Sequence, residues 1–89
     1  MASRTVVIGS KVGLHARPAS LFTQQVDATG LDIWISTEGE EPVDASSILM
    51  VMSLGVGHGE EVTLTSDDEG AEDALDSLVE LLARDLDAE

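Results

Sequence analysis

The stretch EEVTLTSDDEGAEDALDSLVELLARDL, residues 60–86, contains the two hydrophobic periodicities that decide the fold. Valine and leucine alternate with threonine from Glu60 to Ser66, which is typical of a strand with one buried face. After an acidic turn, apolar residues recur every three or four positions, which predicts a helix with one buried stripe. That stripe consists of Ala71, Ala74, Leu75, Leu78, Leu82 and Leu86. A strand followed by an amphipathic helix indicates a domain that combines both element types.

Further strands are predicted earlier in the chain. Arg4–Ile8 is compact and β-branched, and Asp32–Thr37 alternates, with its two isoleucines on one face and its tryptophan on the other. A short strand is predicted around Val43, and the turn Glu38-Gly39-Glu40 makes it the second half of a hairpin. The chain therefore contains four predicted strands.

Two further helices are predicted between these strands. The first begins at Pro18 and stops at Gly30, because apolar residues recur at helical spacing between them. The second is short and covers Ile48–Met52, with serine before it as a cap and Gly55 after it as a stop. With the helix that follows the last strand, the chain contains three.

The predicted element order is βαββαβα. Strands with one apolar face and helices with one apolar stripe imply a two-layer α+β sandwich, in which helices cover one side of an antiparallel sheet. No repeat or low-complexity linker interrupts the pattern, and 89 residues suffice for one hydrophobic core. We therefore expect a single domain over residues 1–89, and a monomer.

Acidic residues dominate the charge of the chain. Four Lys and Arg stand against 18 Asp and Glu, which gives 4 − 18 = −14, and Lys11 is the only lysine. Nucleic acids and anionic membranes are excluded as partners, because both would be repelled. The acidic residues are spread along the chain and lysine is almost absent, which is typical of proteins adapted to concentrated salt. In such salt the Debye length falls to about 3 Å. An ordinarily acidic domain is the alternative.

Composition also limits the chemistry and the location of the protein. Cysteine is absent, which removes disulfides, thiolate metal sites and thiol catalysis. The chain has no secretory signal and no apolar run of membrane-spanning length, so we expect a cytoplasmic protein. His15 and His58 lack a metal-ligand spacing, and Asp67-Asp68-Glu69 lacks the pattern of a calcium loop. No metal and no cofactor are therefore expected.

The candidate site is the segment Gly13-Leu14-His15-Ala16-Arg17-Pro18-Ala19, between the first strand and the first helix. Neutral imidazole is abundant near pH 7 and has a free ring nitrogen, so His15 can attack phosphorus without a general base. A helix N-terminus offers amide groups and the positive end of a dipole, which favour a bound phosphate. Ala16 and Arg17 are the expected amide donors, and the guanidinium of Arg17 can clamp phosphoryl oxygens.

Two questions about this segment stay open. A histidine before a helix can be a capping or exposed loop residue, and Arg17 can pair with a surface acid. Proline at the first helical position would make Arg17 the cap, whereas a helix that starts at Ala16 makes His15 the cap. In both cases His15 lies at the entrance of the helix.

The segment around His15 resembles the active-site signature of the HPr family, the phosphocarriers of the sugar phosphotransferase system. The segment Ser47–Gly55, SILMVMSLG, resembles the second motif of that family. The resemblance covers essentially the whole chain, with two separated motifs, the same element order and the same length. It implies an open-faced β-sandwich, in which a four-stranded antiparallel sheet carries three helices on one face.

The resemblance also implies a relay protein rather than an enzyme. His15 would accept a phosphoryl group through Nδ1 from phosphorylated enzyme I and pass it to a sugar-specific enzyme IIA, with Arg17 assisting. Phosphoenolpyruvate would be the ultimate donor. The nearest alternative is an HPr-like carrier that serves a dihydroxyacetone kinase or a regulatory relay. The alternative from another class is a small non-catalytic α+β binding module.

The short second helix is also a candidate docking surface. Its large apolar residues are Ile48, Leu49, Met50 and Met52. They cannot all face inward from one short helix, so some form an exposed patch, with Leu49 as the foremost candidate; partial burial under the loops is the alternative. By resemblance this patch is the dock for partner proteins.

Two further features follow from the resemblance. The docking face of the first helix includes Ser20 and Gln24, and these residues and Asp27 stand where many relatives carry basic groups. Partners that rely on apolar contact would suit such a surface. Ser47 matches a serine that is phosphorylated in some family members, and its structural interpretation is a helix cap.

Overall fold

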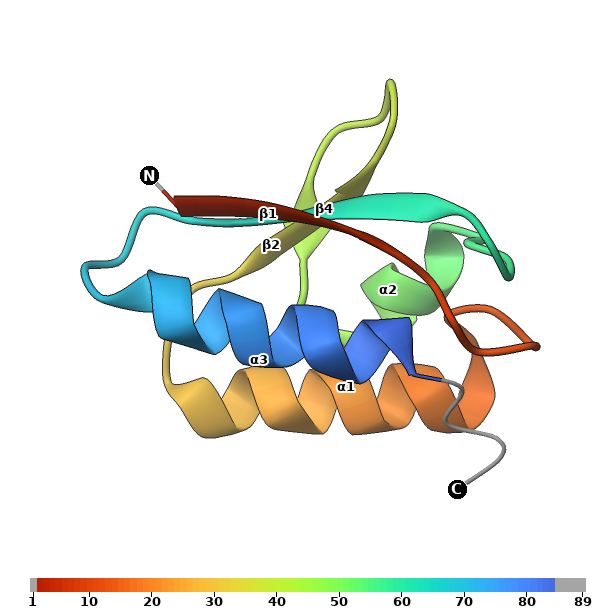
Figure 1. Cartoon of the computed structure of the whole chain (residues 1–89), viewed down its shortest axis with the longest axis horizontal. Helices are drawn as coiled ribbons and strands as arrows, with labels where there is room; N and C mark the ends of the chain where they lie inside the picture. Colours follow the sequence, from red (N-terminus) through yellow and green to blue (C-terminus); the bar gives the residue numbers. More distant parts are fainter. Residues whose placement is uncertain (1, 85–89) are drawn as a thin grey trace.

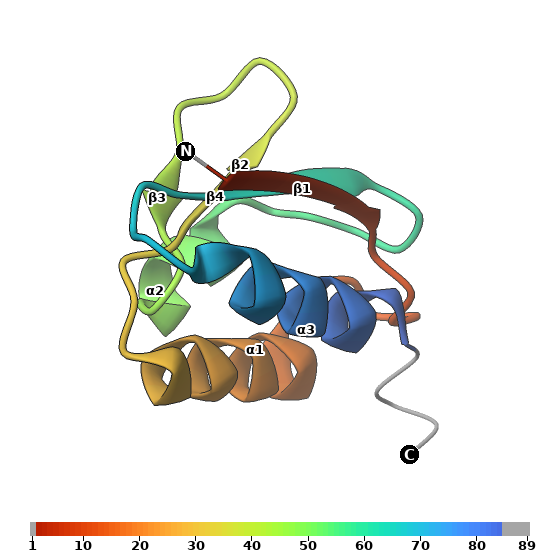
Figure 2. The same ribbon diagram turned by 60° about the vertical axis from the view of Figure 1, so that its left-hand side comes forward.

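The computed structural model describes residues 2–84, which form two layers (Figures 1 and 2). One layer is an antiparallel sheet of β1 (Ala2–Val7), β2 (Trp34–Thr37), β3 (Val43–Asp44) and β4 (Glu61–Ser66), in the order β1-β4-β2-β3. The other contains α1 (Ala16–Thr29), α2 (Ile48–Ser53) and α3 (Ala71–Ala83). All three helices lie on one face of the sheet. The predicted βαββαβα open-faced sandwich is therefore confirmed.

The buried face of the sheet follows the predicted alternation. Ile33 and Ile35 are 2% and 0% exposed, whereas Trp34 between them is 43% exposed. In β4, Val62 and Leu64 are buried and the threonines beside them are half-buried. Because β4 pairs with both β1 and β2, its apolar residues lie at the centre of the sheet.

The helices close the core from the other side. From α1 come Phe22 and Val26, and from α3 come Leu75, Leu78 and Leu82, each at most 2% exposed. Burial of one such side chain stabilises the fold by about 1.5–3 kcal/mol before the entropy of ordering is subtracted. The two helices run antiparallel and pack against each other, so the first turn of α1 and the last turn of α3 share one end of the molecule.

The first strand lies earlier than predicted. It covers Ala2–Val7 instead of Arg4–Ile8, because its pairing with β4 extends to Ala2 opposite Ser66. Ile8 follows the strand and donates its amide hydrogen to the Glu60 carbonyl at 2.9 Å. This boundary depends on pairing with a distant segment, which local sequence pattern does not report.

The helices differ from the prediction in details. The first begins at Ala16, the earlier of the two starts that the sequence left open. In the stripe of α3, Ala74 is half-buried and the expected position of Leu86 lies outside the described residues. Within residues 2–84, no helix has the length and apolar character needed to cross a membrane.

Candidate functional site

The loop between β1 and α1 is held by backbone hydrogen bonds to two other segments and by one within the loop. The Gly9 amide donates to the Leu82 carbonyl at 2.9 Å, at the end of α3. Within the loop, the Gly13 amide donates to Ser10 at 3.0 Å, and the Leu14 amide donates to Val56 at 3.0 Å. The Leu14 side chain is 1% exposed and is part of the core. His15 therefore follows a residue that is anchored on both its backbone and its side chain.

Gly13 is required by the close approach of this loop to the chain after α2. Its φ is +75°, a conformation that favours glycine, and it is buried. A Cβ placed on Gly13 would lie 2.3 Å from the Val56 carbonyl oxygen. Any side chain here would push the His15 loop away from residues 56–57.

His15 is the N-cap of α1, which settles which of the two candidate residues, His15 or Arg17, stands at the cap position. Its backbone is extended, with φ −144° and ψ 156°, and its side chain makes no capping hydrogen bond. The residue is exposed. The imidazole is therefore presented to solvent at the entrance of the helix and takes no part in capping it, so capping does not account for a histidine here.

The first turn of α1 has an unusual backbone. Ala16 has φ +49°, the left-handed region, where a residue with a Cβ is strained by about 1–3 kcal/mol. Pro18 is the third residue of the helix, is buried, and has no amide hydrogen. Because the first amides of a helix have no intrahelical acceptor, the donors that the first turn can offer to an anion are those of Ala16 and Arg17.

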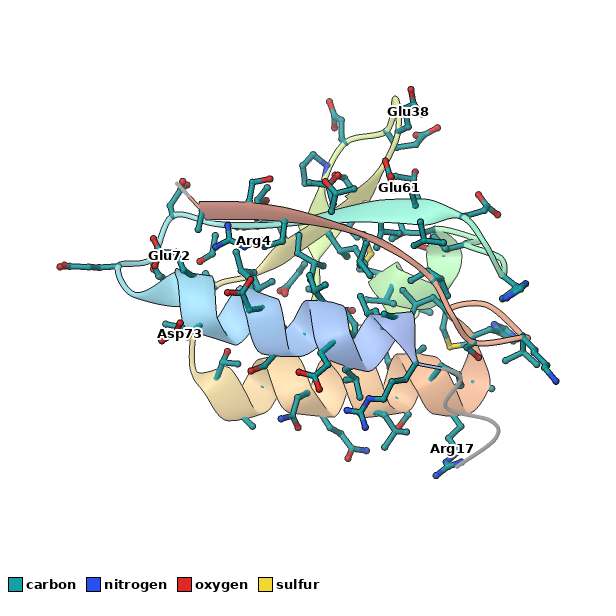
Figure 3. The ribbon with its side chains drawn as sticks, viewed as in Figure 1. Arg4, Arg17, Glu38, Glu61, Glu72 and Asp73 are labelled. Atoms are coloured by element: carbon teal, nitrogen blue, oxygen red, sulfur yellow. The ribbon has the colours of Figure 1, made fainter. Side chains whose placement is uncertain are left out.

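Arg17 projects from the same turn, away from the body of the helices (Figure 3). The residue is exposed and lies two positions from His15. Its guanidinium has the planar donor geometry that matches phosphoryl oxygens. The structure thus brings together, in three consecutive residues, an exposed imidazole, two amides of the first helical turn and a guanidinium.

The apolar residues of α2 divide into an outer and an inner set. Ile48, Leu49 and Met50 are 42%, 76% and 41% exposed, and we call these three residues the α2 patch. Val51 is 0% exposed, and Met52 is half-buried and packs against the core. The sequence predicts Met52 in the docking patch together with these three residues, and its half-burial sets it apart from them. The Leu14–Val56 hydrogen bond holds the chain after α2 beside the His15 loop.

The other residues singled out from the sequence lie on exposed or half-exposed surfaces. Ser47 is the N-cap of α2, and its hydroxyl accepts a hydrogen bond from the Met50 amide at 3.3 Å. On α1, Gln24 Nε2 donates to Ser20 Oγ at 3.1 Å. His58 is exposed in the loop before β4. Within residues 2–84, no three His, Cys, Asp or Glu side chains gather in a way that could hold a metal ion.

Sequence reasoning missed the segments that hold the site in place. Val56 and the backbone at the end of α3 contact the His15 loop, and neither has a chemical signature of its own. The only local signals are Gly9 and Gly13, whose missing side chains permit the contacts. A Cβ on Gly9 would lie 2.0 Å from the Ala83 carbonyl oxygen.

Comparison with known proteins agrees with this fold. Residues 2–84 match the family model described as "PTS HPr component phosphorylation site". The chain is 48% identical over 87 residues to the phosphocarrier protein HPr of Streptomyces coelicolor, covering 98% of this chain and 94% of the relative. It is 42% identical over 81 residues to HPr of Haloferax volcanii, covering 90% and 91%. The crystal structure of HPr from Bacillus anthracis superposes with a TM-score of 0.84 at 38% identity, covering 91% and 95%.

The fold and the site thus define a small phosphoryl-relay domain, with a phosphorylation site and no catalytic activity of its own. The chain belongs to the HPr family of phosphocarriers of the phosphotransferase system.

Proposed function

We propose that His15 is the residue that carries the phosphoryl group. The observation that supports this most is its position: an exposed imidazole at the N-terminus of α1 that makes no capping hydrogen bond. A ring nitrogen, Nδ1 by resemblance, donates its electron pair to phosphorus as the bond between phosphorus and the donor protein breaks, and the electrons of that bond stay with the donor. Neutral imidazole needs no general base for this attack, and transfer to the next protein reverses the same step.

Ala16 and Arg17 stabilise the phosphorylated state. Their amides and the dipole of a 14-residue helix favour a dianion beside His15. The Arg17 guanidinium adds charge-assisted hydrogen bonds to the phosphoryl oxygens. Phosphoryl transfer depends mainly on positioning and charge stabilisation, which these groups supply without any metal or cofactor.

The partners are enzyme I as donor and a sugar-specific enzyme IIA as acceptor. The α2 patch is the principal apolar dock, because it exposes three large apolar residues next to the segment that supports the His15 loop. Ser20 and Gln24 lie on α1, which packs against α2, and complete the docking face with polar groups. The resulting surface is an apolar centre with a polar rim, the usual anatomy of a protein interface.

Phosphorylation with purified enzyme I tests this function. Incubation with phosphoenolpyruvate and the enzyme I of the same host should add one acid-labile phosphate per chain. His15→Ala should abolish the labelling, whereas His58→Ala, the matched control on the chain's other histidine, should leave it intact. Labelling that survives in His15→Ala would overturn the assignment. Transfer onward to a dihydroxyacetone kinase subunit instead of an enzyme IIA would identify the alternative acceptor.

Ser47 acts first as the cap of α2. The hydrogen bond from Met50 supports this role, because a capping serine stabilises a helix by about 0.5–2 kcal/mol. A phosphate on its hydroxyl would place a dianion beside the α2 patch and weaken apolar docking there. Mass spectrometry of the protein isolated from its host would detect such a modification. Ser53→Ala, which removes another hydroxyl of α2, is the control for phosphopeptide assignment.

The acidic surface suits a cytoplasm with concentrated salt. The chain has a net charge of −14, so its acidic side chains repel one another in the folded state. Salt shortens the range of this repulsion to about 10 Å at 0.1 M and about 3 Å at 1 M. We therefore expect folded structure to be lost on dialysis to millimolar salt. A circular dichroism spectrum that is the same in molar and millimolar KCl would contradict this expectation.

A further inference from the structure

Methionine is the only residue type through which this chain contains sulfur. The sequence has three methionines and no cysteine. Met50 and Met52 lie in α2, and Met1 lies outside the described residues. A methionine thioether can be oxidised to a sulfoxide, and dedicated reductases reverse that change. Within residues 2–84, reversible oxidation of sulfur is therefore confined to α2.

The two methionines of α2 differ in their access to solvent. Met50 is 41% exposed and belongs to the α2 patch. Met52 is half-buried and packs against the core. An oxidant dissolved in water has to reach the side chain, so an exposed methionine reacts faster than a packed one. Met50 is therefore the methionine of α2 that we expect to be oxidised first.

The backbone of Met50 is held on both sides by serine hydroxyls. Its amide donates to Ser47 Oγ at 3.3 Å, and its carbonyl oxygen accepts the Ser53 hydroxyl hydrogen at 2.6 Å. Val51, which is 0% exposed, anchors the same turn in the core. None of these contacts uses the Met50 side chain. A chemical change of its thioether therefore alters the surface of α2 and leaves the helix in place.

We propose that Met50 is a site of reversible oxidation by hydrogen peroxide, and that its sulfoxide weakens docking at the α2 patch. The thioether sulfur attacks one peroxide oxygen, so an S–O bond forms as the O–O bond breaks. The departing hydroxide takes the proton of the transferred oxygen and becomes water. Sulfur is oxidised by two electrons, and the peroxide is reduced by the same two.

The sulfoxide changes the character of the α2 patch. Its oxygen is a polar hydrogen-bond acceptor, and covering such a group with an apolar partner surface costs free energy unless a donor meets it. Ile48 and Leu49 precede Met50 and stay apolar, so docking is weakened and not abolished. This effect rests on the docking role proposed for the α2 patch, and it adds a reversible chemical control to that surface.

Oxidation rates measured separately for each methionine test the choice of site. The full chain is treated with hydrogen peroxide in 3 M KCl, and tandem mass spectrometry follows the sulfoxide at Met50 and at Met52. In the folded protein Met50 should react at least about fivefold faster than Met52. In concentrated urea the two rates should agree within about twofold, because both side chains are then exposed. Equal rates in the folded protein would overturn Met50 as the preferred site.

Binding to enzyme I tests the effect of the sulfoxide. After the peroxide is removed, oxidised wild type should bind unoxidised enzyme I about 3- to 10-fold more weakly in calorimetric titration. Met50→Leu keeps an apolar side chain of similar volume, and peroxide should change its binding by less than about twofold. Met52→Leu is the matched control and should respond as the wild type does. Equal weakening in oxidised Met50→Leu would place the effect at another residue and overturn the proposal.

Reversal and folding complete the test. Methionine sulfoxide reductases A and B should together restore the binding of oxidised wild type, since each reduces one of the two sulfoxide epimers. Its circular dichroism spectrum should match that of the untreated protein. Weakened binding that accompanies a loss of helical signal would mean that oxidation unfolds the chain, and would contradict a change confined to the surface.

The untreated protein separates this proposal from the proposed function. Leu49→Ala, without peroxide, reports whether the α2 patch docks enzyme I. If Leu49→Ala weakens binding and oxidation of Met50 does not, only the role of the sulfoxide fails. If neither weakens binding, the docking role of the α2 patch fails as well. Labelling of His15→Ala would overturn the phosphorylation site and leave the oxidation rates of Met50 and Met52 unaffected.

Discussion

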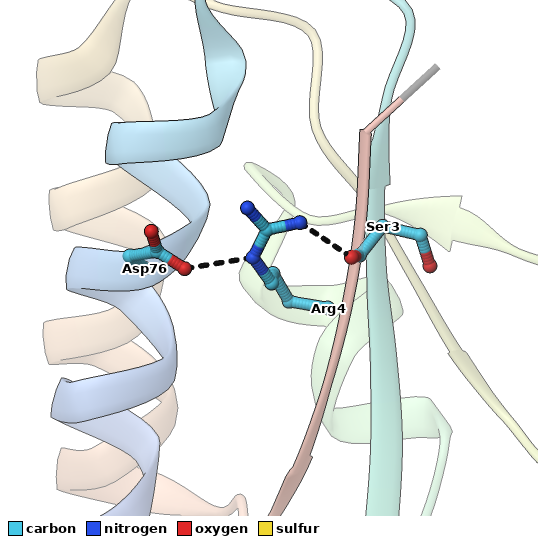
Figure 4. A network of polar contacts seen from close by, with 3 residues as sticks. All are labelled: Ser3, Arg4 and Asp76. Atoms are coloured by element: carbon cyan, nitrogen blue, oxygen red, sulfur yellow. Dashed lines mark hydrogen bonds and ion pairs between the residues drawn. The ribbon is translucent and has the colours of Figure 1, made fainter.

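Arg4 Nε lies 2.7 Å from Asp76 Oδ1, and this ion pair links the edge strand β1 to the outer side of α3 (Figure 4). A second guanidinium nitrogen of Arg4 donates to the Ser3 carbonyl oxygen at 2.8 Å. The side chains of Arg4 and Asp76 are 36% and 59% exposed. One of the four cations of the chain thus holds two layers of the fold together at the surface.

We predict that this pair contributes modestly to stability. A double-mutant cycle with Arg4→Ala and Asp76→Ala should give a coupling energy of about 0.2–1 kcal/mol, because water screens exposed ion pairs. Urea denaturation of the four proteins measures it, and the coupling should fall further at high salt. A coupling above about 2 kcal/mol would show that the pair behaves as a buried one.

Replacement of Gly13 should destabilise the protein through a steric clash. Gly13→Ala places a Cβ 2.3 Å from the Val56 oxygen, whereas Gly39→Ala, at φ +81°, meets nothing within 4 Å. Both variants incur the cost of a positive φ, so their difference isolates the clash. Gly13→Ala should lose about 1–3 kcal/mol more than Gly39→Ala in urea denaturation. Equal losses would mean that the loop at Gly13 shifts without cost.

The left-handed conformation of Ala16 makes this position sensitive to β-branching. Ala16→Val should cost about 1–2 kcal/mol in unfolding free energy, because a branched side chain strains a residue at φ +49°. Ala28→Val is the matched control: Ala28 is also exposed on α1, in ordinary helix, and the change should cost only about 0.5 kcal/mol. Ala16→Gly should be no less stable than the wild type. A destabilised glycine variant would contradict the strained backbone.

Substitutions of Leu49 and Val51 should distinguish a role of α2 in docking from a role in stability. Leu49→Ala should change unfolding free energy by less than about 0.5 kcal/mol, since the side chain is 76% exposed. It should weaken binding to enzyme I about tenfold, as expected for the centre of an apolar dock. Val51→Ala should instead destabilise the protein by about 1–3 kcal/mol, because Val51 is 0% exposed. Calorimetric titration and urea denaturation distinguish the two. Unchanged binding by Leu49→Ala would remove the α2 patch from the interface.

The hydrogen bonds of Asp44 predict a dependence of stability on pH. The Ser46 hydroxyl at 2.7 Å and then the Ser46 amide at 2.9 Å lower the pKa of the Asp44 carboxyl below its ordinary value. A lowered pKa means that the carboxylate stabilises the fold above the ordinary pKa of about 4. This contribution is lost as the pH falls through the lowered pKa. The unfolding free energies of wild type and Asp44→Asn should therefore differ most near pH 6–7 and converge toward pH 3.

Ser46→Ala tests the cause of this effect. The variant lacks the hydroxyl donor and keeps the amide, so its pH dependence should lie between those of the wild type and Asp44→Asn. A wild-type profile in Ser46→Ala would show that the hydroxyl does not lower the pKa of Asp44.

Much of the fold could be predicted from local pattern. The alternation in β4 and the apolar stripe of α3 as far as Leu82 were confirmed, because side-chain periodicity follows directly from strand and helix geometry. The predicted exposure of Trp34 and burial of its neighbours Ile33 and Ile35 were confirmed for the same reason. Boundaries were less accurate. The start of β1 depends on pairing with Ser66, more than 60 residues away, and local sequence does not encode that pairing.

The candidate site could likewise be predicted only in part from the sequence. The type and spacing of His15, Ala16 and Arg17 are properties of the sequence, and they predict phosphate chemistry at a helix entrance because helix N-termini bind anions. The sequence left the capping residue undecided, and the structure assigns His15 to it. It also left undecided which residues of α2 face solvent, because a helix of six residues has no periodicity long enough to define one face.

The sequence by itself determined the order of the elements, the residue types of the site and a strongly acidic net charge, since each is a local or compositional property. Only the tertiary structure decided that Gly9 meets the end of α3, that Gly13 meets Val56, and that the first turn of α1 and the last turn of α3 share one end of the molecule. These contacts join residues that are distant in sequence. They form because burying one apolar core between the sheet and the helices forces the chain's connecting segments together.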